Sequence, residues 1–241
     1  MRYLTLILLL LLSPAAMADT FTTDFEGGVN AGNWTFSGGG WLDTLHPTGG
    51  NPDGWYGVNG IDTFAPILSS EYGAEVFAGN YVTMQVSRIS GDFKTDASSN
   101  DWADSYNFTV LLRNNNNTPG DIEDDLYVYP DPFNNVVPPV GQGWTHYDFD
   151  IPSDFVGAPG ELPAGWVGGS YFSGPDWFPE DRTFQEVLAN VTSVEFWWIH
   201  PAFFAILGIW DAGADNITIE YADGAVATEE ASWGGVKALF R

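Results

Sequence analysis

The sequence predicts an all-β fold, an antiparallel β-sandwich of the jelly-roll type with one short helix near residues 183–190. Gly (28 residues) and Pro (15 residues) keep the apolar runs short, which is typical of sandwiches and barrels. Aromatic residues make up 16% of the chain and include 11 Trp, which favours a packed core over the disorder common in acidic chains. The strand pattern is clearest between Thr183 and Tyr221.

That segment combines one helical turn with three apolar runs. Phe184, Val187 and Leu188 recur at i, i+3 and i+4, the spacing of one helix face. The β-branched and aromatic residues that follow predict strands in succession. We expect these strands at residues 192–199, 203–210 and 216–221, with a break at His200-Pro201 and a turn at Asp211–Ala214.

The chain before this segment is expected to alternate strands with turns. Most of its apolar runs are bounded by Gly, Pro, Asn or Asp, which end strands. The expected strands lie at residues 21–26, 33–36, 41–42, 55–58, 63–68, 81–88, 106–113, 126–129 and 144–151. Loops are expected at residues 46–54, 92–104 and 114–120, and a long Gly/Pro-rich one at 154–179.

Residues 1–18 have the pattern of a secretory signal peptide. Arg2 supplies the charged start, Leu4–Leu12 the apolar centre, and Ala16-Met17-Ala18 a small-x-small cleavage site. The apolar run is too short for a membrane span, and no other stretch reaches that length without a break. We therefore expect a mature chain from Asp19 that is extracellular, surface-bound or periplasmic.

The charge of the mature chain excludes some partners. Without the signal, six basic side chains face 32 acidic ones, so we expect no binding to nucleic acid or to anionic membranes. Divalent cations would be attracted instead. The chain has no Cys, so an exported form does without disulfides, which fits a bacterial secreted protein.

The composition changes after residue 222. We expect the sandwich to occupy residues 19–222 and residues 223–241 to form a flexible acidic linker with a short C-terminal amphipathic segment. In residues 232–241, Trp233, Val236, Leu239 and Phe240 lie near helical spacing, beside two cations. Too short to be stable in water by itself, this segment is expected to order only on a partner, which the sequence does not identify.

The order of these pieces resembles the laminin IV type (laminin B) domain, here in a bacterial secreted protein. The matching pieces are Asp24–Gly28 (DFEGG) with a Gly-rich segment after it, Phe64-Ala65-Pro66, Tyr72-Gly73, Thr183–Thr192 after a Trp, and Asp215–Ile217 (DNI). The resemblance spans roughly residues 21–221 and is related in pattern to carbohydrate-binding jelly rolls. It implies a non-enzymatic extracellular sandwich with carbohydrate or matrix as ligand. The animal laminin context of cysteines and EGF-like repeats is missing.

No catalytic motif is evident, so we expect no enzyme. The chain lacks a Cys nucleophile and a G-x-S-x-G sequence, and its three His are far apart without zinc-ligand spacing. The acidic run Asp121–Asp125 could supply paired carboxylates for glycoside cleavage. It follows a loop, however, so a solvated turn explains it better.

Calcium is the expected metal, with Asp24, Glu26 and Asp215 as candidate ligands. The first and last strands of a jelly roll commonly lie side by side, which would bring these carboxylates together. Calcium takes six to eight oxygen ligands from carboxylates and backbone carbonyls. The alternative is that Asp24 and Asp215 are turn residues that bond their own backbone.

Three loop tryptophans, Trp102, Trp166 and Trp177, are the candidate ligand-binding residues. Each lies among Gly, Pro or Asp, where an exposed indole could stack on a sugar while neighbouring polar groups bond its hydroxyls. Loops folded back over the ends of the sheets remain the alternative.

The leading interpretation is a secreted, non-catalytic binding module for an extracellular polysaccharide or glycan, with a structural calcium site. A calcium-binding structural surface or matrix protein is the first alternative, and an unrecognised glycan-active enzyme is the second. The sequence leaves the ligand's identity and the oligomeric state open.

Overall fold

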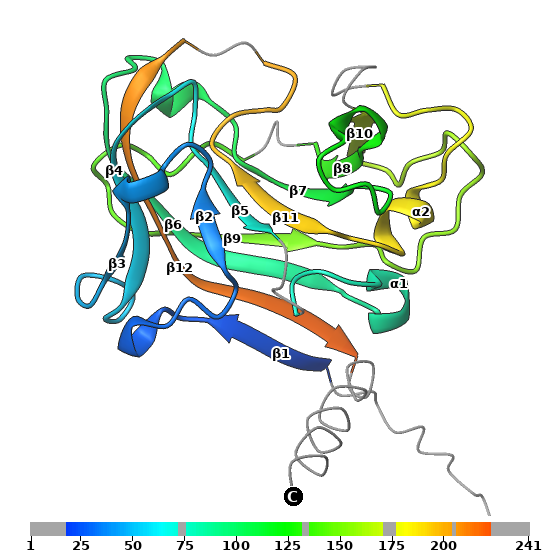
Figure 1. The fold of residues 1–241 in the computed structure, drawn as a ribbon, viewed down its shortest axis with the longest axis horizontal. Helices are drawn as coiled ribbons and strands as arrows, with labels where there is room; N and C mark the ends of the chain where they lie inside the picture. The colour runs from blue at the N-terminus through cyan, green and yellow to red at the C-terminus, as the bar shows by residue number, and fades with distance from the viewer. Residues whose placement is uncertain (1–17, 72–75, 132–134, 171–176, 204–205, 223–241) are drawn as a thin grey trace, which may run out of the picture.

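The computed structural model describes residues 18–71, 76–131, 135–170, 177–203 and 206–222. Within these ranges, twelve strands form two antiparallel sheets of six strands each, which confirms the predicted all-β sandwich (Figure 1). The predicted signal peptide and C-terminal segment lie outside the described residues.

The first sheet has the order β3-β4-β12-β6-β9, and β1 also pairs with β12. Its strands are β1 (Ala18–Thr23), β3 (Asp43–His46), β4 (Trp55–Thr63), β6 (Arg88–Ser98), β9 (Thr145–Asp150) and β12 (Gly208–Ala222). The second sheet has the order β10-β8-β7-β11-β5-β2. Its strands are β2 (Trp34–Phe36), β5 (Ile67–Glu71), β7 (Thr109–Asn114), β8 (Leu126–Pro130), β10 (Trp166–Ser170) and β11 (Ser193–Trp197).

The core between the sheets is largely aromatic. Phe93 on β6 lies 4.5 Å from Phe196 on β11 and 4.8 Å from Phe108 beside β7, measured between ring centroids. All three side chains are fully buried. Because the side chains of a strand alternate between faces, the residues next to Phe93 and Phe196 point away from this core. Those outward positions carry the polar clusters described below.

The predicted helix near residues 183–190 is present as α2 (Phe184–Leu188). Thr183 caps it: its hydroxyl accepts a hydrogen bond from the amide of Glu186, and the Glu186 carboxylate accepts one from the amide of Thr183. A second short helix, α1 (Tyr81–Met84), was not predicted. No helix among the described ranges is long and apolar enough to cross a membrane.

Several sequence predictions are corrected by the structure. The strand expected at 81–88 is wrong, because Asn80 caps helix α1 and accepts a hydrogen bond from the amide of Thr83. The turn expected at Asp211–Ala214 is wrong as well, since these residues continue β12 through a bulge. The expected loops at 92–104 and 154–179 contain most of β6 and all of β10, respectively. Residues 41–42 belong to a 3-10 helix.

Candidate binding surfaces

Asp215, one of the predicted calcium ligands, is a fully buried carboxylate on β12. It lies in register with Asp92 on β6, which is also buried. One Asp215 carboxylate oxygen accepts the amide of Asn51 at 2.6 Å and the other accepts the amide of Asn216 at 2.8 Å. The Asn51 and Asn216 carboxamides both donate to Asp92, at 3.1 and 2.9 Å.

The pKa of Asp215 is raised to about 6. Burial is the main cause, hydrogen bonds from the Asn51 and Asn216 amides oppose it, and the negative charges of Asp92 and Glu26 add to it. Three carboxylates therefore repel one another electrostatically at this point of the first sheet. The imidazole of His146 lies beside them, with its Nδ1 2.7 Å from a carboxylate oxygen of Asp92.

The loop at residues 47–54 connects Glu26 to Asp215, because its amides donate hydrogen bonds to both carboxylates. The Glu26 carboxylate accepts the amide of Gly54 at 2.8 Å, so Glu26 and Asp215 hold the two ends of a short stretch of this loop. Asp24 is exposed, and its carboxylate accepts a hydrogen bond from the amide of Glu26 at 3.1 Å. This is the local turn hydrogen bond that the sequence offered as the alternative to a calcium ligand. Pairing of Thr23 with Ile217 is what brings the two chain regions together.

The three predicted tryptophans lie in different environments. Trp102, in the connection between β6 and β7, is 66% exposed, and Trp177 is 57% exposed. Trp166 opens the edge strand β10 and is half-buried, with its ring edge-on to Phe184 at 5.2 Å. Trp166 thus packs partly against the core.

The outer face of the second sheet carries a polar cluster that the sequence reading missed. We call it the Arg113 cluster: Arg113 on β7, Asp125 next to β8, and Ser193, Glu195 and Trp197 on β11. The Arg113 guanidinium binds both oxygens of Glu195, at 2.6 and 3.1 Å, and one oxygen of Asp125 at 3.1 Å. The side chains of Asp125 and Glu195 are each only 5% exposed.

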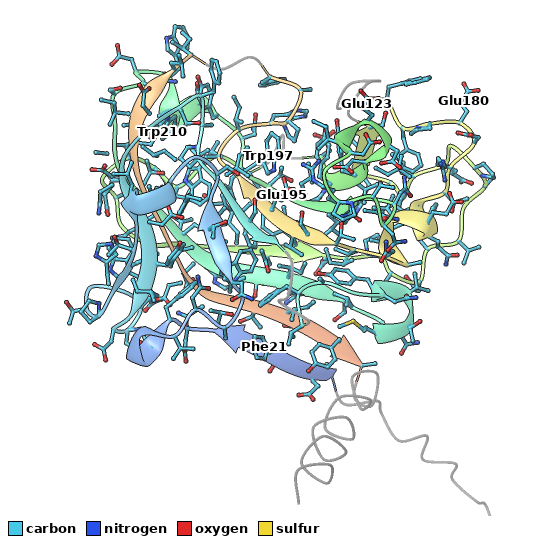
Figure 2. The ribbon with its side chains drawn as sticks, viewed as in Figure 1. Phe21, Glu123, Glu180, Glu195, Trp197 and Trp210 are labelled. Carbon is cyan, nitrogen blue, oxygen red and sulfur yellow. The ribbon has the colours of Figure 1, made fainter. Side chains whose placement is uncertain are left out.

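Trp197 belongs to this cluster through its indole. The indole N–H donates to Glu195 at 2.9 Å, and the Ser193 hydroxyl donates to the same carboxylate at 2.9 Å. Trp197 is half-buried, so part of its ring faces solvent. Figure 2 shows Glu195 and Trp197 together on β11. The result is an aromatic ring held in place at the edge of a fixed network of charges.

Electrostatics keep the Arg113 guanidinium charged. Burial alone would lower the pKa of Arg113, but Glu195 and Asp125 hold it above its ordinary value. Burial raises the pKa of Asp125, and Arg113 opposes that rise. Two carboxylates share one guanidinium, so the cluster is a fixed acceptor-rich surface beside the rings of Trp197 and Tyr127.

The outer face of the first sheet carries a second aromatic group. The Lys94 ammonium lies 3.6 Å from the ring centroid of Trp55 and 4.8 Å from that of Trp144, and it pairs with Asp96 at 2.8 Å. His46 stacks on Trp55 at 3.7 Å. Lys94 and Trp55 are buried, so this group stabilises the sheet through cation–π contacts and is less accessible than Trp197.

A signal for the Arg113 cluster was present in the sequence. The strand expected at 192–199 puts Val194, Phe196 and Trp198 on its core side, and Ser193, Glu195 and Trp197 therefore lie on the other. The sequence did not show which strands lie beside β11, and so it did not show which side chains join these three. The structure supplies this information: Ser193 pairs with Arg113 across β11 and β7.

No protein-family model and no curated protein matches the chain. The laminin IV resemblance therefore stays a prediction. Three solved structures are similar in shape. CtCBM11, a carbohydrate-binding module, is 18% identical with a TM-score of 0.40 and covers 87% of this chain and 98% of its own.

The K1 cleaved adhesin domain of Lys-gingipain from Porphyromonas gingivalis W83 is 12% identical (TM-score 0.36; 86% of this chain, 99% of that one). A carbohydrate esterase from Shiga toxin-encoding bacteriophage phi24B is 13% identical (TM-score 0.39; 84% of this chain, 100% of that one). These scores are too low to transfer a ligand or a reaction. The described residues form an antiparallel β-sandwich, a fold that does not by itself assign a function.

Proposed function

We propose that this protein is a secreted, non-catalytic binding module for carbohydrate, and that the Arg113 cluster is its ligand-contact surface. The observation that carries the proposal is the Trp197 indole, half-exposed on a sheet face and fixed by its own N–H to the buried Glu195. An indole offers a flat apolar face for the C–H face of a sugar ring.

The polar half of the cluster suits the hydroxyls of a sugar. Arg113 binds one carboxylate oxygen of Asp125, which leaves the other for a sugar hydroxyl, and the Ser193 hydroxyl, which donates to Glu195, can still accept a hydrogen bond. Because Arg113 already holds both carboxylates, little side-chain entropy remains to be lost on binding. A preorganised surface of this kind favours a neutral, hydroxyl-rich ligand over an anion.

The test is a glycan and polysaccharide binding screen on the mature chain, followed by calorimetry with any ligand found. Trp197→Ala should weaken binding by about 2 kcal/mol, roughly thirtyfold, as for a central aromatic contact. Trp197→Phe keeps a stacking ring but loses the bond to Glu195, so it should fall between Trp197→Ala and wild type. Trp102→Ala and Trp177→Ala, at exposed tryptophans outside the cluster, are the matched controls.

Each alternative gives a different result in the same screen. If Trp102→Ala or Trp177→Ala abolishes binding and Trp197→Ala does not, the loop tryptophans are the site and the Arg113 cluster is structural. Turnover of a polysaccharide that is lost on changing one carboxylate would identify an enzyme. Calcium-dependent self-association without sugar binding would identify a structural matrix protein.

We also propose that calcium binds beside Asp215 and stabilises the fold. In support, Asp215, Asp92 and Glu26 place three carboxylates within electrostatic range at one point, and a cation there would offset their repulsion. The fit is partial. No set of three or more metal-ligating side chains in suitable geometry occurs in the described part of the chain, so carbonyl oxygens would have to complete the shell. Unfolding measured with and without EDTA tests this proposal.

A further inference from the structure

Five large apolar side chains gather at one end of the sandwich. Phe64, Trp102, Ile206, Leu207 and Ile209 are between 52% and 66% exposed. They are five of the eleven large hydrophobic side chains that are exposed in the described residues. Single exposed apolar residues are ordinary, but a contiguous group marks an interaction surface. We call this group the end patch.

Backbone and side-chain contacts join the members of the end patch. Ile209 and Ser99 make two hydrogen bonds. The Ser99 amide donates to the Ile209 carbonyl at 2.9 Å, and the Ile209 amide donates to the Ser99 hydroxyl at 2.8 Å. The Asn100 carboxamide donates to the carbonyl of Ile206 at 3.2 Å and accepts the amide of Trp102 at 2.9 Å. Gly208 pairs with Thr63, the neighbour of Phe64. Three connections of the chain therefore present these side chains together.

The end patch is surrounded by negative charge. Asp62, Asp101 and Asp104 are exposed and lie beside Phe64 and Trp102 in the chain. Of the seven basic residues of the chain, four (Arg88, Lys94, Arg113 and Arg182) are in the described part, and none of them lies in the segments that form the patch. An apolar surface with an acidic rim fits an apolar partner that carries cations.

The chain itself contains a segment of that chemistry. Trp233, Val236, Leu239 and Phe240 are apolar, and Lys237 and Arg241 are two of the seven basic residues. Residues 232–241 are otherwise uncharged. This segment and the end patch are thus complementary in both hydrophobicity and charge.

Distance argues against docking within one molecule. β12 starts at the end patch and crosses the molecule to Ala222, next to β1 (Figure 1). The 13 residue steps from Ile209 to Ala222 have a contour length of about 43 Å at the rise of a strand, and β12 bends along this path (Figure 1). The 11 steps from Ala222 to Trp233 have a root-mean-square length of only about 20 Å when flexible. At its average length this linker would leave the segment short of the patch of its own chain, since even full extension gives it only about 40 Å.

We propose that the segment Trp233–Arg241 of one copy docks on the end patch of a second copy. The contact joins two different surfaces, so a pair of molecules keeps one free patch and one free segment. Such a head-to-tail contact does not close on itself and gives chains of copies that lengthen with concentration. The proposal is independent of carbohydrate binding, because it uses neither the Arg113 cluster nor the residues around Asp215.

The test uses the mature full-length chain in light scattering across a concentration series. Wild type should increase in mean mass beyond a dimer as concentration rises. Leu207→Asp should stop this growth by placing a charge in the patch, and Phe240→Asp should stop it by placing one in the segment. Leu207 is 58% exposed, so its substitution leaves the core intact, and a thermal melt verifies this. Ile206→Asp is a second patch variant.

Mixing the two variants separates this contact from others. Leu207→Asp has a damaged patch and an intact segment, whereas Phe240→Asp has the reverse. Together they can form one contact only, so the mixture should give a one-to-one dimer although each variant is monomeric. A labelled peptide of residues 223–241 should bind wild type and lose at least about tenfold in affinity for Leu207→Asp.

Several results would overturn the proposal. Head-to-tail docking is excluded if wild type stays monomeric at every concentration. It is also excluded if wild type stops at a dimer and both variants still form that dimer. The proposal also fails if the mean mass of both single variants rises with concentration as it does for wild type. If deletion of residues 223–241 causes assembly, the segment covers the patch of its own chain and not that of a second copy.

Discussion

Asp215 combines complete burial with two backbone amide donors and two acidic neighbours. Its raised pKa, about 6, lies above the value near 4 of an unfolded Asp. The folded state therefore binds this proton more tightly than the unfolded state. Asp215 contributes stability that is fully present below about pH 4 and is lost as the pH rises to about 6.

This gives a prediction for unfolding as a function of pH. In EDTA, the free energy of unfolding of wild type should fall between pH 4 and 7 by up to about 3 kcal/mol more than that of Asp215→Asn. A cation beside Asp215 lowers its pKa, so calcium should flatten the difference. At a hundredfold excess over Kd, calcium should add about 2.7 kcal/mol to wild type and less to Asp215→Asn.

Denaturant unfolding across this pH range, in EDTA and in calcium, measures both effects. Equal curves with and without calcium would remove the metal proposal. Equal pH profiles for wild type and Asp215→Asn would show that the buried carboxylate is not the group that titrates.

At the scale of elements, the loop at residues 47–54 is fastened to the first sheet at several points. The amides of Asn51 and Gly54 donate to Asp215 and Glu26, and the Trp55 indole donates to the carbonyl of Thr48 at 3.1 Å. Gly54 is buried, and a Cβ there would lie 2.6 Å from the carbonyl oxygen of Phe25. The loop therefore sits against the backbone of residues 25–26, which holds Glu26 in place.

Gly54→Ala should force the loop and residues 25–26 apart and destabilise the protein by about 1–3 kcal/mol. If calcium binds beside Glu26 and Asp215, the variant should also lose its response to EDTA. Gly60→Ala is the control, because its φ of +73° carries a conformational cost while no atom lies within 4 Å of the added Cβ. Thermal melts in calcium and EDTA compare the two, and an unchanged melting temperature for Gly54→Ala would contradict the packing of this loop.

Elements that depend on a short sequence motif could be predicted from the sequence. Elements that depend on pairing or packing with distant parts of the chain could not. α2 begins at a Thr-x-x-Glu capping box that can be read from the sequence. Residues 81–86 alternate like a strand, yet Asn80 caps a helix there and Gln85 ends it at a φ of 51°. Asp211–Ala214 has the composition of a turn but continues β12, because β4 and β6 pair with it on both sides.

At the scale of the whole molecule, the first and last described strands of the sandwich lie side by side. Ala222, the last residue of β12, pairs with Ala18 at the start of β1, so both chain ends of the sandwich are fixed in one antiparallel pair. Within the described residues, the core cluster spans both sheets from Phe25 to Tyr221.

Deletion of Asp223–Arg241 should therefore leave the free energy of unfolding within about 0.5 kcal/mol of the full-length value. Circular dichroism and denaturant melts of residues 19–222 and 19–241 measure it. A truncated chain that unfolds or melts several degrees lower would show that the C-terminal segment packs into the core, and would replace the flexible-linker interpretation.

The sequence by itself determined the class of this fold and several of its strands, since turn residues, period-two patterns and a capping box act over a few positions. It also indicated that the β1 and β12 regions meet. Only the tertiary structure decided which outward side chains become neighbours. Arg113 and Glu195 are 82 residues apart, and Ile209 and Phe64 are 145 apart. Their proximity depends on strand order and register, which are set by the packing of the whole core and not by local sequence.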